Sequence, residues 1–227
     1  MIDPLILARS VHIVATVLAS GTVCFMVLVA DVPALRRRLT VTIWMALALA
    51  IVSGAAWLVW LAAEIHGAPV AEVCLNGGAW TVLTDTRFGQ VWCARLALAL
   101  LLGVLMLCPS ARWLALIAAA LLIAMLGWIG HAGATPGLAG SVHLASDMVH
   151  LMAAGAWLGG LPALVLLLAQ ARRSRKPAWR AVVIAATQRF RCSGSCVSPH
   201  CWGAARSIAG TCWPGRAICW RPTTAGW

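Results

Sequence analysis

Residues 5–30 read LILARSVHIVATVLASGTVCFMVLVA, an almost unbroken apolar run that is long enough to cross a bilayer as one helix. Its only basic residues are Arg9 and His12. The run is longer than the apolar core of a signal peptide, and no basic segment precedes it. We therefore expect a helix that is retained in the membrane.

Four more apolar runs follow, over about residues 39–65, 88–108, 113–130 and 142–170. Another begins near residue 178 but reaches residue 190 without becoming apolar enough to span. The sequence predicts an all-α fold: a polytopic transmembrane helical bundle over residues 1–190, with about five spans and an aborted sixth.

Composition supports a membrane protein. The chain has 227 residues, 62% of them hydrophobic and 10% charged, whereas soluble domains are nearer half apolar and a quarter charged. Disorder requires low hydrophobicity, so it is excluded as well. The net charge of +11 does not indicate nucleic-acid binding, because basic soluble domains lack this apolar content. The expected surroundings are a lipid bilayer.

The basic residues of the connections predict the orientation. One side holds residues 36–38, Arg112 and the basic cluster of 172–180. The other side holds Arg87, and we interpret Arg9 and Arg95 as charges close to helix starts. Because cytoplasmic loops carry the excess of Lys and Arg, the N-terminus is expected outside.

Small and aromatic residues predict packing and anchoring. Gly155 and Gly159 form a small-xxx-small pair that would let two helix backbones approach closely, although glycine is also common in transmembrane helices generally. Tryptophans near span ends, Trp57 and Trp92 among them, are expected to be interfacial anchors.

Ionisable residues in the spans indicate where function lies, because burying them in lipid is costly. His143, Asp147 and His150 share one helical stripe, and the topology places them with His131 and His12 in the outer half of the bundle. Imidazole and carboxylate together are ligands for a transition metal. A histidine near the interface can also be merely solvated, and for His12 alone that alternative stays open.

Softer ligands are available deeper in the bundle. Met148 and Met152 flank the stripe and Cys24 lies further along the first span, so the three are possible inner ligands, with ordinary packing as the alternative. No catalytic motif accompanies them, and we do not expect an enzyme.

Three motifs resemble the copper resistance protein D family of bacterial inner-membrane proteins. They are residues 84–92 (TDTRFGQVW), residues 130–132 (GHA), and the segment from His143 through His150 to residues 156–161 (AWLGGL). The resemblance covers about residues 5–190. It implies a copper ion taken up from the periplasm, a small periplasmic copper-carrier protein as partner, and His131, His143 and His150 as ligands.

The resemblance stops near Phe190. Similar proteins continue with further hydrophobic helices, whereas residues 191–227 hold five of the nine cysteines and no acidic residue. We expect residues 191–227 to be an atypical, poorly ordered tail that is read out of frame. A genuine short tail on the cytoplasmic side or the membrane surface is the alternative.

Two other functions remain open from the sequence. Inward histidines such as His12, His131 and His150 could bind haem as axial ligands in a membrane cytochrome. The chain could also be an inactive, truncated relative of the family.

Overall fold

The computed structural model describes residues 3–129, 137–174 and 177–194, and helices account for all of the regular structure in these ranges. The long elements are α1 (Pro4–Cys24) with its π-helical extension η1 (Phe25–Val29), α2 (Pro33–His66), α5 (Arg87–Met106), α6 (Arg112–Ala124) with its 3₁₀ extension η3 (Met125–Ile129), and α7 (Gly137–Ser174). The shorter elements are α3 (Val70–Leu75), α4 (Gly78–Asp85), η2 (Pro109–Ala111) and α8 (Ala178–Gly194).

Five of these segments are long and apolar enough to cross a membrane, as predicted. They are residues 4–29, 33–66, 87–106, 109–129 and 137–174. The start of α1 is well defined, because Asp3 accepts a hydrogen bond from the Leu5 amide and Pro4 occupies the first turn. The second span begins earlier than expected, at Pro33, so the arginines of residues 36–38 belong to the first turns of α2.

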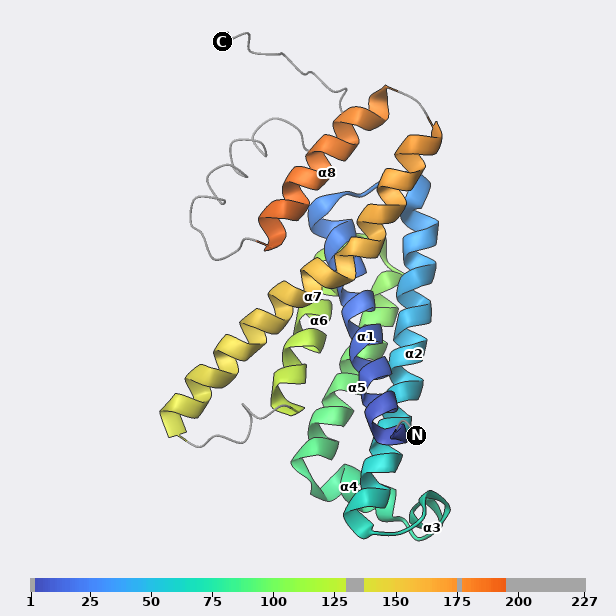
Figure 1. The fold of residues 1–227 in the computed structure, drawn as a ribbon, viewed down its shortest axis with the longest axis vertical. Helices are drawn as coiled ribbons and strands as arrows, with labels where there is room; N and C mark the ends of the chain where they lie inside the picture. Colours follow the sequence, from blue (N-terminus) through green and yellow to red (C-terminus); the bar gives the residue numbers. More distant parts are fainter. Residues whose placement is uncertain (1–2, 130–136, 175–176, 195–227) are drawn as a thin grey trace. The chain divides into compact units, whose positions relative to one another are not determined.

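The spans alternate in direction, which gives the bundle two ends (Figure 1). We call the end that holds α3, α4 and the start of α1 the α3–α4 end. The opposite end, where α2 and α6 begin, is called the basic end because Arg36, Arg37, Arg38 and Arg112 lie there. The starts of α5 and α7 and the whole of η3 belong to the α3–α4 end.

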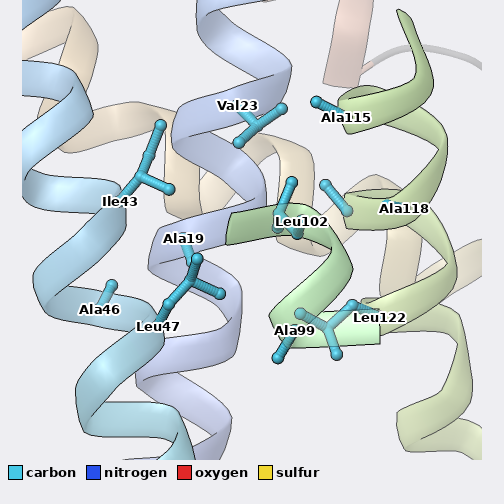
Figure 2. Close-up of a cluster of buried hydrophobic side chains, with 11 residues drawn as sticks. Ala19, Val23, Ile43, Ala46, Leu47, Ala99, Leu102, Ala115, Ala118 and Leu122 are labelled. Carbon is cyan, nitrogen blue, oxygen red and sulfur yellow. The ribbon is translucent and has the colours of Figure 1, made fainter. Parts of the chain in front are cut away.

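Four helices share one hydrophobic core (Figure 2). Its buried side chains are Ala19 and Val23 of α1, Ile43, Ala46 and Leu47 of α2, Ala99 and Leu102 of α5, and Ala115, Ala118, Ala119 and Leu122 of α6. The many alanines allow the helix axes to approach closely, which is how helices associate in lipid without a hydrophobic driving force between them.

Helix α7 crosses α1 at a contact made by glycines, which confirms the expected close approach. A Cβ atom on Gly159 would overlap the carbonyl group of Val17 and lie 3.0 Å from Gly21 Cα, and one on Gly21 would meet the backbone of Gly155 and Gly159. The two backbones are thus in direct contact, and no larger residue fits there without moving a helix.

The aborted sixth run forms α8, which is not among the helices able to span. It packs through Ala186 and Phe190 on a second core that includes Phe25 of η1 and Leu167 of α7, with the two phenylalanine rings 6.4 Å apart. Helix α8 continues to Gly194, four residues past the predicted boundary of the tail. Residues 195–227 lie outside the described residues. The expected disorder of the tail and its reading out of frame therefore stay predictions.

Candidate functional site

The predicted metal stripe lies on the first half of α7, at the α3–α4 end. His143 and His150 are exposed, and Asp147 is half-buried. The carboxylate of Asp147 faces η3, because a Cβ atom on Gly127 would lie 3.7 Å from Asp147 Oδ2. The stripe therefore runs along the edge of the face that packs against η3.

His131 lies outside the described residues, in the connection of residues 130–136 that joins η3 to α7. Within residues 3–129, 137–174 and 177–194, no three His, Cys, Asp or Glu side chains are grouped closely enough to hold a metal ion. The predicted set of His131, His143, Asp147 and His150 is thus not tested as a whole. Its described members occupy the helix that directly follows the His131 segment.

The softer predicted ligands fall into two places. Met148 packs against η3 beside Asp147, with its Cγ 3.2 Å from the Cβ position of Gly127, and Met152 is half-buried one turn further along α7. Cys24 is buried at the end of α1. Cys24 follows Gly21 on α1 whereas the methionines precede Gly155 on α7, so they lie on opposite sides of the helix crossing.

His12 is buried in the bundle and both of its ring nitrogens have partners. Nδ1 lies 2.8 Å from the carbonyl oxygen of Ala50, and Nε2 lies 2.9 Å from a guanidinium nitrogen of Arg95. Because arginine only donates, Nε2 accepts, and Nδ1 must carry the proton that it donates to Ala50. In this arrangement His12 has no free lone pair for a metal or for haem iron.

Arg95 is the charged centre of this network. The sequence suggested a charge close to a helix start, but this interpretation is wrong, because Arg95 lies about two turns inside α5. Its side chain is only 2% exposed, in the interior of α5. It donates to the carbonyl oxygen of Leu122 at 2.7 Å and to Thr16 Oγ1 at 3.4 Å. Its Nε atom has no partner in the described part of the chain.

Two tryptophans enclose the network. Trp57 packs on the His12 ring at 5.6 Å, and Trp92 donates to the carbonyl oxygen of Gly54 at 3.0 Å. Trp57 is 4% exposed, so the prediction of an interfacial anchor is wrong for it. Gly54 makes room for both groups, because a Cβ atom there would lie 3.0 Å from His12 Nδ1 and 3.2 Å from Trp92 Nε1.

This network joins α1, α2, α5 and α6 around a cavity of about 20 Å³, the size of one water molecule. A guanidinium group beside His12 disfavours a cation there, so the network suits helix positioning better than metal capture. Sequence reasoning missed the role of Arg95. The available signal was an arginine well inside an apolar run, where charge is costly.

A third polar feature lies in the turn between α5 and α6. Cys108 is exposed, and its Sγ lies 3.1 Å from Ser110 Oγ. Hydrogen bonds from Ser110, first from its hydroxyl and then from its backbone N–H, lower the pKa of the Cys108 thiol below its ordinary value.

Comparisons with known proteins identify the family. Residues 1–141 match the family described as "Copper resistance protein D-like, N-terminal domain". The inner membrane protein YebZ of Escherichia coli (strain K12) is 32% identical over 118 residues, which cover 51% of this chain and 39% of YebZ. The chain thus aligns with about two-fifths of that relative's length, and no solved structure matches. With its five membrane-spanning helices, the chain belongs to the copper resistance protein D-like family and is a multi-pass inner-membrane protein.

Proposed function

We propose that this chain captures copper at the outer face of the bacterial inner membrane and takes part in its import. The observation that carries the proposal is the stripe of His143, Asp147 and His150 on α7. It lies at the bundle end from which the connection holding His131 emerges. Imidazole nitrogens bind copper well, and Asp147 supplies a negative charge beside them.

The orientation supports capture from outside. The basic end holds the arginines at the starts of α2 and α6 and at the end of α7, which favours placing this end in the cytoplasm and the α3–α4 end in the periplasm. A periplasmic copper carrier would then deliver the ion to the exposed His143 and His150. Met148 and Met152 are the next soft donors along α7, and Cys24 lies deeper. His12 can bind the ion on this path only if the hydrogen bond from Arg95 to the His12 Nε2 atom breaks.

The test compares copper accumulation in cells that carry the chain, its His131→Ala variant or its His143→Ala/His150→Ala variant, at equal membrane levels by immunoblot. We expect both variants to lose accumulation. His66→Ala is the matched control, because His66 lies at the same end but binds the Ala62 carbonyl group at 2.9 Å. Unchanged accumulation in both variants would refute the site.

Two further measurements address the other functions. Wild-type accumulation no higher than that of a vector control would favour an inactive relative. An absorption spectrum of the purified chain tests haem binding, since a Soret band would indicate a cytochrome.

A further inference from the structure

A cavity of about 410 Å³ opens at the basic end, at the opposite end of the bundle from the histidine stripe. Sulfur-bearing side chains line it from three segments: Met26 of η1, Met106 at the end of α5, and Cys108 in the turn that follows. This is a separate group of donor atoms from the predicted inner ligands Cys24, Met148 and Met152.

The two methionines are held in place by the bundle. Both are half-buried and pack against the main hydrophobic core, so their places in the cavity wall are preformed. Cys108 is exposed and lines the cavity together with Ser110, whose Oγ lies 3.1 Å from the Cys108 Sγ and can donate to a thiolate. One thiolate and two thioethers are a soft donor set of the kind that favours Cu(I) over harder or divalent ions.

The charges around the cavity favour a monovalent ion. Asp31 and Arg36 form an ion pair at 2.7 Å and largely cancel each other, so this pair adds little net charge to the wall. A divalent cation would need more negative charge than one thiolate supplies. A monovalent ion on a single thiolate gives a neutral centre, which this wall tolerates.

We propose that this cavity is a soft-metal site that binds Cu(I) through Cys108, Met26 and Met106. On binding, the Cys108 thiol releases its proton, a Cu–S bond forms, and no electron is transferred. Its physiological role rests on the proposed copper function, in which the cavity receives the ion at the cytoplasmic end of the bundle.

The experiment uses the 227-residue chain purified in detergent, with Ag(I) as a redox-inert probe for Cu(I). Alkylation of each cysteine by N-ethylmaleimide is followed by mass spectrometry with and without the metal. Cys74, exposed on α3 at the other end, is the internal control. The variants are Met26→Leu/Met106→Leu, which nearly conserve volume, and Met45→Leu, a matched control at a 68% exposed position on α2.

We expect Ag(I) to slow alkylation of Cys108 by about tenfold or more relative to Cys74, and Zn(II) not to do so. The Met26/Met106 variant should need about tenfold more Ag(I) for the same protection, and the Met45 variant should behave as wild type. Equal protection of Cys74 and Cys108, or an unchanged double variant, would overturn the site.

A further variant distinguishes failure of the cavity site from failure of the proposed copper import. The His143→Ala/His150→Ala variant should retain the protection of Cys108, because those residues lie at the other end. If accumulation proves independent of these histidines and of His131 while protection holds, the proposed function fails and the cavity site stands. If accumulation requires the histidines but Cys108 is unprotected, only the cavity site fails.

Discussion

His12 Nε2 lies 2.9 Å from a guanidinium nitrogen of Arg95, although 83 residues separate the two in the sequence. Both side chains are buried, and the contact ties α1 to α5. A charged side chain makes the contact here, whereas the main core of the bundle is formed by apolar side chains, many of them alanine. The contact also fixes the protonation pattern of His12, because Arg95 can only donate.

Replacing Arg95 should destabilise the bundle. Arg95→Gln removes donors from the Leu122 carbonyl oxygen and His12 Nε2, and each buried acceptor left unpaired costs about 1–3 kcal/mol. Thermal unfolding of the purified chain, followed by tryptophan fluorescence, measures the loss. Arg87→Gln, at an exposed position on the same helix, should cost less. An equal loss in both variants would show that the buried contacts contribute nothing specific.

Gly54 is predicted to tolerate no side chain. In Gly54→Ala the new methyl group would press on His12 Nδ1 and Trp92 Nε1, and overpacking of this kind costs about 1–3 kcal/mol. The same unfolding assay applies, with Ala55→Val as the control because Ala55 is exposed on the next position of α2. A Gly54→Ala protein as stable as wild type would contradict the packing described around His12.

The α1–α7 crossing predicts a graded response at two adjacent glycines. Gly159→Ala brings a methyl group onto the backbone of Val17, which can move only with its helix, whereas Gly160→Ala meets the Phe190 ring at 2.9 Å. Because a ring can turn aside, we expect the larger loss of stability at Gly159. Unfolding by a titration of sodium dodecyl sulfate into mild detergent ranks the two variants. A larger loss at Gly160 would reverse this prediction.

Cys108 should be alkylated at lower pH than an ordinary thiol. Ser110 lowers the pKa of the Cys108 thiol, so the reactive thiolate forms at lower pH, and the midpoint of the labelling rate against pH should lie below that of an ordinary thiol. In Ser110→Ala the hydroxyl donor is lost and the midpoint should rise. Labelling quantified by mass spectrometry between pH 6 and 10 measures the shift. A midpoint that is the same in both proteins would exclude the hydroxyl as the cause.

Most of the fold could be predicted from the sequence, because each span is a continuous apolar run and its length alone identifies it. The stripe of His143, Asp147 and His150 was also predictable, since a single helix fixes the spacing of its own residues. Gly159 was recognised as a candidate for close packing, but its partner Gly21 was not. The role of His131 and the origin of the tail remain predictions.

The sequence by itself determined that the chain is a helical membrane protein, and it predicted that His12, His143 and His150 lie toward one end of the bundle. Only the tertiary structure decided that Arg95 reaches His12 and Leu122, that Gly54 accommodates His12, and that Met26, Met106 and Cys108 share one cavity. The physical reason lies in the solvent. In lipid both the outer and the inner faces of a helix are apolar, so hydropathy does not encode which face points inward. Contacts between distant helices follow from that rotation, which is set by packing alone.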